Sequence, residues 1–264
     1  MAGISGAFAE LRIAMKTNRL AKSEENGNQI FASAGIVLKF VRHHSWLELS
    51  RRVWTTATGW FLENRTRFIM KLLPEKAEKP DPTLEIKELV LSDIDQMLAV
   101  MYLSRANICR RFGRGERCFA VIDDGGIATY FWAQFGARYI DGLRLTFNLK
   151  SNQAWFYNAI TVKRARGKGY YPNIIRYMNQ TLASDGFDEF FIDVEEKNLA
   201  SIRGMKKAGF KEIVKIQMKK LLSKAKYETS VFDKKGWEQL SEMICNFPNK
   251  QDVAEKYLDG NHDS

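Results

Sequence analysis

The sequence predicts an α/β fold in which helices pack on a mixed β-sheet. The chain has 264 residues, of which 45% are apolar and 27% charged. This is the balance of a globular protein that is long enough to bury a hydrophobic core. After residue 82, segments with a period of two alternate with segments of helical spacing, in the order β-α-β-β-β-α-β-α-β. Such an alternation is typical of a layered fold with helices on a sheet.

The first predicted elements follow a proline-rich segment. Residues 84–89 alternate apolar and charged side chains, which indicates a strand. Ser92 is a suitable N-cap for a helix that runs toward Gly113. Residues 118–122 and 127–132 flank an Asp-Gly-Gly turn. Because Asp-Gly turns supply the positive φ that tight hairpins require, these two segments predict a β-hairpin.

The rest of the sheet is predicted from clusters of β-branched and aromatic residues. Such residues are enriched in strands, and they indicate further strands at 154–162, 189–194 and 211–222. Helical spacing between and after these strands predicts helices at 172–183, 199–208 and 237–244. Gly186 and Gly209 follow the first two helices, where a glycine commonly ends a helix.

We expect three parts along the chain. Residues 1–80 form a basic and aromatic N-terminal extension that is partly helical, residues 81–225 form the α/β domain, and residues 226–264 form a helix and a polar tail. The first boundary follows from residues 73–82, whose three prolines interrupt regular structure. The net charge is +10, and residues 1–80 carry +6 of it, with 13 basic and 7 acidic residues. Such a charge attracts polyanions, including phosphorylated small molecules.

Residues 39–73 interleave aromatic side chains with lysine and arginine. Two interpretations stay open: a helical extension that packs its tryptophans on the sheet, or a peripheral contact with an acidic membrane surface. Residues 68–73 are compatible with a short strand. A cytoplasmic location is expected, with membrane association left open. The three cysteines have no disulfide or metal spacing, and no apolar run reaches the roughly 20 residues that cross a bilayer.

The segment 163–172 carries the strongest chemical signal. It follows a predicted strand and precedes a predicted helix, and its four cations are Lys163, Arg164, Arg166 and Lys168. Gly167 and Gly169 let the main chain approach a ligand and point N–H groups into one concavity, and the helix that follows adds the positive end of its dipole. A pyrophosphate fits such a cradle. The segment matches neither the dinucleotide fingerprint nor the Walker pattern.

This turn resembles the acyl-CoA pyrophosphate loop of the GNAT acyltransferase (N-acetyltransferase) superfamily, Gln/Arg-x-x-Gly-x-Gly/Ala. In one register Arg166 and Gly169 match, and Tyr171 stands where glycine or alanine is usual. In a second register Arg164, Gly167 and Gly169 match. Further along, Asn198 to Ser201 resembles the second signature of the superfamily, and residues 205–210 resemble its closing Lys-x-Gly-Phe. The resemblance covers residues 82–222.

The resemblance implies a mixed, mostly antiparallel sheet with splayed central strands and flanking helices. Acyl-CoA would lie as co-substrate between the fourth strand, 155–162, and the fifth, 189–194, without a metal. N–H groups near Thr161 and Val162 would hold the pantetheine and polarise the thioester carbonyl. The full cofactor-binding set that the resemblance implies is Thr161, Val162, Arg164, Arg166, Gly167, Lys168, Gly169, Tyr170, Asn198 and Ser201.

The catalytic groups are less well defined by the sequence. Many members of the superfamily place a tyrosine, as general acid, where this chain has Met205, which has no proton to donate. An amine nucleophile needs a base. The candidates are Asp193 and Glu195, which alternate onto one face of the fifth strand, and Tyr157 on the fourth. Acceptor specificity is expected from the first helix and from the insertion 136–148.

The expected function is acetyl transfer from acetyl-CoA to an amine of a sugar or other small metabolite, by direct attack in a ternary complex. One alternative is a long-chain N-acyl synthase that takes its acyl group from acyl carrier protein, whose acidic surface a basic enzyme would attract. A second is a membrane-binding or nucleic-acid-binding protein with a degenerate CoA site, although nucleic acid is the less favoured partner. The acceptor itself is not indicated by the sequence.

Overall fold

The computed structural model of the chain describes residues 62–72, 78–221, 224–246 and 253–257. The basic and aromatic segment before Leu62, with its candidate membrane contact, lies outside the described residues. Residues 73–77, the first half of the proline-rich segment 73–82, also lie outside them.

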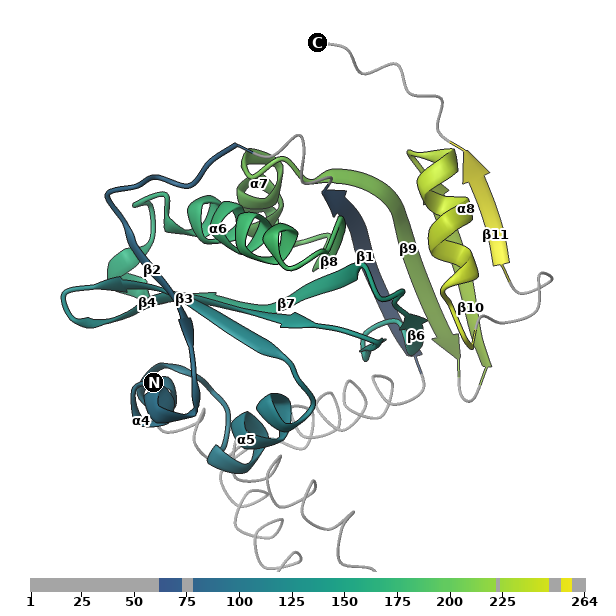
Figure 1. The fold of residues 1–264 in the computed structure, drawn as a ribbon. Coiled ribbons are helices and arrows are strands. Elements are labelled where there is room, and N and C mark those ends of the chain that lie inside the picture. Colours follow the sequence, from purple (N-terminus) through teal and green to yellow (C-terminus); the bar gives the residue numbers. More distant parts are fainter. Residues whose placement is uncertain (1–61, 73–77, 222–223, 247–252, 258–264) are drawn as a thin grey trace, which may run out of the picture. The chain divides into compact units, whose positions relative to one another are not determined.

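Nine strands form one sheet, in the order β11-β10-β9-β1-β8-β7-β4-β3-β2 (Figure 1). Two pairs, β7 with β8 and β10 with β11, are parallel, and the other pairs in this sheet are antiparallel. The bounds are β1 Leu62–Leu72, β2 Glu85–Leu89, β3 Arg117–Asp123, β4 Gly126–Gln134, β7 Gln153–Thr161, β8 Glu189–Glu195, β9 Lys211–Leu221, β10 Lys224–Val231 and β11 Val253–Tyr257. A separate hairpin joins β5, Ala137–Ile140, to β6, Leu145–Asn148.

Helices cover both faces of this sheet. The helices are α4 Ile94–Val100, α5 Arg105–Gly113, α6 Tyr170–Ser184, α7 Leu199–Lys207 and α8 Lys234–Glu242, with short 3₁₀ turns at Leu91–Asp93 and Lys163–Ala165. One face packs against α6 and α7. The other packs against α4 and α5 at one end and against α8 and the β5–β6 hairpin at the other. Within the described residues, no helix is both long and apolar enough to span a bilayer.

The two central strands are buried on both faces. Side chains of a strand alternate between faces, so Phe156 and Phe190 join the core under α6 and α7, whereas Trp155 and Phe191 join the core under α8 and the hairpin. All four are fully buried. The nearly continuous apolar runs of β7 and β8 are therefore what a parallel pair at the centre of a two-sided sheet requires.

The pairing between β7 and β8 is short. It covers Gln153 to Phe156 on β7 and Glu189 to Ile192 on β8. Beyond these residues β7 stays paired with β4, and β8 stays paired with β1 through Glu195. The two strands therefore diverge from Tyr157 onward, which is the splay that the resemblance implies.

A bulge in β7 lies at the point of divergence. Tyr130 and Trp132 on β4 pair with Ile160 and Tyr157 on β7, so β7 contains one residue more than its partner. Asn158 has a φ of +48°, a conformation that asparagine tolerates better than most residues. An extra residue changes the direction of the chain, and here it does so where β7 loses its partner β8.

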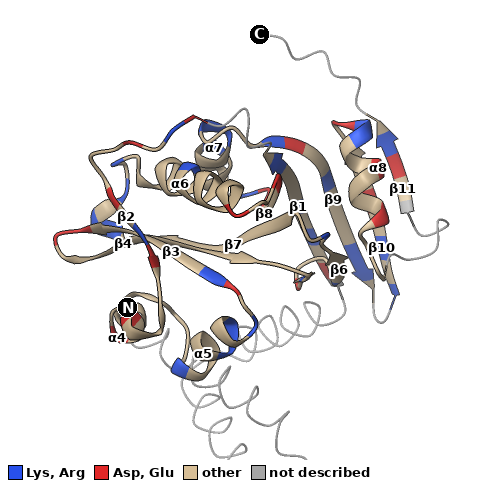
Figure 2. Ribbon diagram, viewed as in Figure 1, with Lys and Arg blue, Asp and Glu red and all other residues tan. Residues whose placement is uncertain are grey.

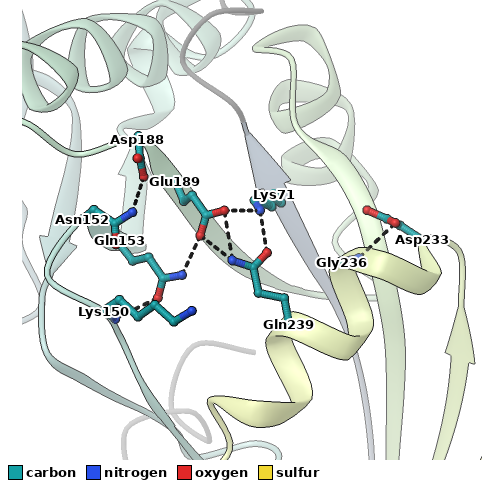
Figure 3. A network of polar contacts seen from close by, with 9 residues as sticks. All are labelled: Lys71, Lys150, Asn152, Gln153, Asp188, Glu189, Asp233, Gly236 and Gln239. Carbon is teal, nitrogen blue, oxygen red and sulfur yellow. Dashed lines mark hydrogen bonds and ion pairs between the residues drawn. The ribbon is translucent and has the colours of Figure 1, made fainter.

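A polar network closes the paired end of β7 and β8 (Figure 3). Glu189 accepts hydrogen bonds from Lys71 Nζ at 2.5 Å, from Gln153 Nε2 at 2.6 Å and from Gln239 Nε2 at 2.8 Å. Burial disfavours its charged form, but these donors outweigh burial, and the pKa of Glu189 is lowered. The network joins β1, β7, β8 and α8.

The expected domain boundaries are wrong at both ends of the α/β region. β1 was assigned to the extension 1–80, but it lies between β8 and β9. β10 and β11 belong to the sheet as well, although 226–264 was expected to hold a helix and a polar tail. The partners of β1 lie more than 100 residues away in the sequence, which hides the pairing, whereas β10 forms a hairpin with the adjacent β9. The structure divides the chain at residue 60.

Some single elements differ from those expected from the sequence, and the causes lie in the nearby chain. The helix expected over 92–113 is two helices, because the chain becomes extended at Met101 and Ser104 caps the second one through a hydrogen bond from Asn107 N–H. The hairpin around Asp124 and Gly125 is present, with positive φ at both. The insertion 136–148 is not a plain loop but the β5–β6 hairpin.

Candidate active site

The loop between β7 and α6 has the conformation of an open cradle. Gly167 has a φ of +83°, and Gly169, the N-cap of α6, has a φ of +76°. Tyr171 lies inside the helix, where no positive φ is needed. The two positions that favour glycine are thus 167 and 169, and they fit the register with Arg164 rather than the one that places Tyr171 at a glycine position.

The main-chain donors of this cradle are free. Among the hydrogen bonds of the described residues, none has the N–H of Gly167, Lys168, Gly169 or Tyr170 as its donor. No described atom lies within 4 Å of a Cβ built on Gly167. The first N–H groups of a helix have no partner inside it, so these amides are available to an anion.

The basic side chains of the loop are partly neutralised by the β3–β4 turn. Asp123 accepts from Lys168 Nζ at 2.9 Å and from Arg164 Nη1 at 3.4 Å. The hydrogen bond from Lys168 is the largest cause that lowers the pKa of Asp123. Arg166 donates to the carbonyl of Thr161 at 3.4 Å. Neither Arg166 nor Lys163 has an ion pair among the described residues.

Thr161 and Val162 differ in what their main chain offers. The N–H of Val162 donates to the carbonyl of Ala128 at 2.9 Å, so it is not free to hold a pantetheine, and that expectation is wrong. Successive N–H groups of a strand point to opposite edges. The N–H of Thr161 therefore points toward the side from which β8 has diverged.

The second signature forms a helix cap. Asn198 is the N-cap of α7, and its Oδ1 accepts from the N–H of Ser201 at 3.2 Å. The Ser201 side chain hydrogen-bonds Tyr171, whose pKa is raised by burial against the effect of that bond. The carboxamide oxygen of Asn198 is therefore committed to the helix, which weakens its expected role on the pantetheine arm. Met205 is 3% exposed and lies in the core.

Asp193 is held as a buried anion. It is 3% exposed in its side chain and accepts from Arg67 Nη1 at 2.6 Å, from Trp155 Nε1 at 2.9 Å and from Arg138 Nη2 at 3.3 Å. Both carboxylate oxygens are used, and two guanidinium groups stabilise the charge. Because its buried carboxylate already accepts three hydrogen bonds, two of them from guanidinium groups, Asp193 is suited to positioning the arginines rather than to accepting a proton.

Glu195 keeps a freer carboxylate. Its side chain is 55% exposed and has one hydrogen bond, from Arg67 Nη2 at 3.2 Å. Glu195, Asp193 and Tyr157 all line one cavity of about 490 Å³, together with residues of β1 and the β5–β6 hairpin. The three catalytic candidates are thus brought together at the divergence of β7 and β8.

Tyr157 is a proton donor in this arrangement. Its hydroxyl donates to Glu116, which is 5% exposed. Burial, and then the hydrogen bond to Glu116, raise the pKa of Tyr157, so the phenol keeps its proton at neutral pH. As a base Tyr157 is therefore unsuitable. Glu116 is a residue that the sequence did not single out, because a buried glutamate in a loop has no pattern of its own.

Three arginines of the site were also missed. Arg111 of α5 and Arg138 of the hairpin both stack on the Tyr157 ring, at 4.9 and 4.5 Å from its centroid. With its amide oxygen turned toward α5, Asn158 accepts from Arg111 at 2.7 and 2.9 Å. Arg67 of β1 completes the group. Figure 2 shows basic residues along α5 in blue. Arg111 of the first helical segment and residues 138–142 of the insertion line the cavity, and their role in acceptor specificity stays a prediction.

Comparison with known proteins gives distant structural likenesses. No protein-family model and no curated protein matches the chain. A protein described as a GNAT-family acetyltransferase from Novosphingobium aromaticivorans is similar at 18% identity and a TM-score of 0.46, over 61% of this chain and 66% of its own. A GNAT-family acetyltransferase from Colwellia psychrerythraea is similar at 15% identity and a TM-score of 0.42, over 61% of this chain and 57% of its own.

An aminoglycoside N-acetyltransferase in complex with CoA is similar at 15% identity and a TM-score of 0.39, over 48% of this chain and 92% of its own. The chain spans less than two thirds of the length of the Novosphingobium and Colwellia proteins. None of these likenesses identifies a substrate for this chain. The architecture is defined instead by the strand order and by the divergence of the parallel pair β7 and β8: the described residues form a large mixed, mostly antiparallel sheet with splayed central strands and helices on both faces.

Proposed function

We propose that this protein is an acyl-CoA-dependent N-acyltransferase. The observation that carries the proposal is the divergence of β7 and β8 after Phe156 and Ile192. It places a strand edge without a partner strand between two features: a cradle of free amides where β7 ends, and a cavity of about 490 Å³ where the divergence begins. A carrier with a diphosphate at one end and a thioester at the other fits this sequence of features.

The diphosphate would bind to the cradle. Its oxygens would accept from the N–H groups of residues 167–170, where the positive end of the α6 dipole also favours an anion. Arg166 and Lys163, which have no ion pair among the described residues, add positive charge. In this proposal the main-chain N–H groups contribute more to diphosphate binding than the basic side chains do. Asp123 already neutralises Arg164 and Lys168 in part.

The thioester would lie along the open edge of β7. The N–H of Thr161 is directed to that edge, and a donor of this kind, aimed at the oxygen of a tetrahedral intermediate, is worth about 3 kcal/mol. The amine nitrogen attacks the thioester carbon, the C–S bond breaks, and CoA leaves as the thiolate. Glu195 is the proposed base for the amine proton, since its carboxylate has a free oxygen and lies in the cavity.

The leaving thiolate also takes a proton. Met205 cannot supply it, and the Tyr157 hydroxyl, which lines the cavity, already donates to Glu116 and holds its proton firmly. The proposed proton donor to the thiolate is therefore solvent water. A cavity of this volume with charged walls suits a small polar acceptor, so the proposed reaction is acetyl transfer from acetyl-CoA to the amine of a sugar or another small metabolite.

Isothermal titration with acetyl-CoA tests the donor site. Gly169→Glu introduces a negative charge at the cradle and should lower acetyl-CoA affinity at least 10-fold. Gly186→Glu is the matched control: Gly186 also has positive φ, +94°, but it follows the other end of α6. It should bind acetyl-CoA like the native protein. Equal affinities for the two variants would mean that the cradle does not hold the diphosphate.

A further inference from the structure

Two neighbouring cavities at the site differ in charge. The larger is lined by four arginines and four carboxylates, so its wall is neutral overall. The smaller has about 340 Å³ and is lined by four arginines and one glutamate, a net charge of +3. Arg111, Arg138, Tyr139 and Tyr157 border both. A ligand that spans this border would meet carboxylates on one side and guanidinium groups on the other.

Three of the four arginines of the smaller cavity lack acidic partners among the described residues, and the fourth, Arg138, pairs with Asp193. Arg110, Arg111 and Arg114 have no ion pair among the described residues, although many other lysines and arginines there do. The single carboxylate in the wall, Glu116, already accepts from Tyr157. Like charges held together are unfavourable unless a counter-charge binds. The wall therefore presents an unmatched positive site.

Two of the four arginines, Arg111 and Arg138, are also preorganised by aromatic rings. Arg111 stacks on Trp132 and on Tyr157, each with 4.9 Å from its guanidinium carbon to the ring centroid. Arg138 also stacks on Tyr157, at 4.5 Å from its ring centroid, and its Nε–H has no acceptor among the described residues. A guanidinium fixed by stacking loses little freedom when it binds, and its planar fork matches the two oxygens of a carboxylate or a phosphate.

We propose that the acceptor of this enzyme carries an anionic group, a carboxylate or a phosphate, which binds to Arg110, Arg111 and Arg114 in the smaller cavity. Its amine lies in the larger cavity, beside Glu195. This inference rests on the proposed acyl transfer and adds the acceptor class: an amino acid or an amino-sugar phosphate in place of a neutral amine. The residues that bind the anion are specificity determinants and do not take part in the proton transfers.

Matched pairs of acceptors test the class by the release of CoA from acetyl-CoA. Comparing glucosamine 6-phosphate with glucosamine measures how much a phosphate raises kcat/KM. Comparing phenylalanine with phenylalaninamide measures how much a carboxylate raises it. In at least one pair the anionic member should have a kcat/KM at least 10-fold higher. Equal values in both pairs, or a preference for the neutral members, would overturn the proposal.

Variants locate the anion. The double variant Arg110→Gln and Arg114→Gln should raise the KM of the anionic acceptor at least 10-fold and leave the KM of acetyl-CoA unchanged. The matched control is Arg105→Gln on the same helix, since Arg105 is exposed, pairs with Asp95 and lines neither cavity. It should leave both KM values unchanged. A loss of acetyl-CoA affinity in the double variant would assign the arginines to the donor instead.

If the protein acetylates none of these acceptors, direct titration with small anions still tests the anion site. Inorganic phosphate and acetate are titrated into the protein without CoA. Binding of at least one that is lost in the double variant and kept in Gly169→Glu supports the inference, even if the proposed transfer fails. Binding lost in Gly169→Glu and kept in the double variant places the anion in the β7–α6 loop and overturns it, as does no binding of either anion.

Discussion

Strand β8 carries two buried carboxylates with similar partners and different surroundings. Glu189 pairs with Lys71 of β1, and Asp193, four residues later, pairs with Arg67 of the same strand. Glu189 lies where β7 and β8 are paired, and its partners from β7 and α8 surround it. Asp193 lies where the strands diverge, beside a cavity of about 490 Å³. The same kind of ion pair closes the sheet at one end and forms the wall of a site at the other.

The comparison teaches which carboxylate can act chemically. Asp193 borders the cavity, yet its side chain is 3% exposed, less than the 17% of Glu189. Position beside a cavity thus does not make a group reactive. Asp193 orients Arg67 and Arg138, whereas Glu195, two residues further, retains an oxygen that can accept a proton.

The largest expected effect breaks the ion pair at the open end. Asp193→Ala leaves Arg67 and Arg138 without their shared carboxylate, and removing one partner of a buried pair costs about 3–5 kcal/mol. Urea unfolding measures this loss in the free energy of unfolding. Asp188→Ala removes an exposed aspartate near the start of the same strand and should cost less than about 1 kcal/mol. Equal losses would show that Asp193 is not a structural anchor.

A smaller loss in the free energy of unfolding is expected at Glu189, where β7 and β8 are paired. Glu189→Gln keeps the size of the side chain but removes the charge that Lys71 faces, at a cost of about 1.5–3 kcal/mol for hydrogen bonds to a charged group. Because this network lies away from the cavity, the KM values for acetyl-CoA and for the acceptor should not change. A changed acceptor KM would mean that the two ends of β8 are coupled.

Acidification should remove the contribution of Glu189 without any substitution. Its folded-state pKa is below the usual 4.5, so its stabilisation is complete above pH 4.5 and is lost as the pH falls through the lowered value. The difference in unfolding free energy between native protein and Glu189→Gln should therefore shrink from pH 6 to pH 3. A difference that stays constant would exclude the charge of Glu189 as its cause.

The smallest effect on stability is expected at Glu195. Its contact with Arg67 is exposed, so Glu195→Gln should cost less than about 1 kcal/mol. As the proposed base it should nonetheless lower kcat by about 10²–10⁴-fold. Stability comes from urea unfolding and kcat from CoA release. An unchanged kcat would remove Glu195 from the mechanism.

Much of the local structure could be predicted from the sequence. Alternation and glycine positions located β7, β8, α6 and α7 to within about two residues, because these signals depend on neighbours in the chain. The β7–α6 cradle was identified for the same reason: its glycines, its cations and the following helix are contiguous. Strand geometry put Asp193 and Glu195 on one face, whereas their expected gathering with Tyr157 depended on the strand order that the resemblance implies.

The parts of the fold and of the site that the sequence did not predict depend on contacts between segments that lie far apart in the sequence. Nothing local reveals that β1 lies between β8 and β9, so Arg67 was not recognised as part of the site. The hairpin at 137–148 appeared as an insertion, which hid Arg138. Arg111 has the pattern of a solvated helix residue, and its role follows from the side chains of β4 and β7 on which it stacks.

The central place of β1 has a consequence for how this protein is made. On the ribosome β1 emerges early, yet Arg67 meets Glu195, which follows it by 128 residues. Until β8 and β9 have been synthesised, β1 has neither of its partner strands, and the cavity that Arg67 lines is incomplete. Two fragments divided between residues 73 and 78 should therefore assemble by complementation when mixed, and acyl transfer should appear only when the shorter fragment is added.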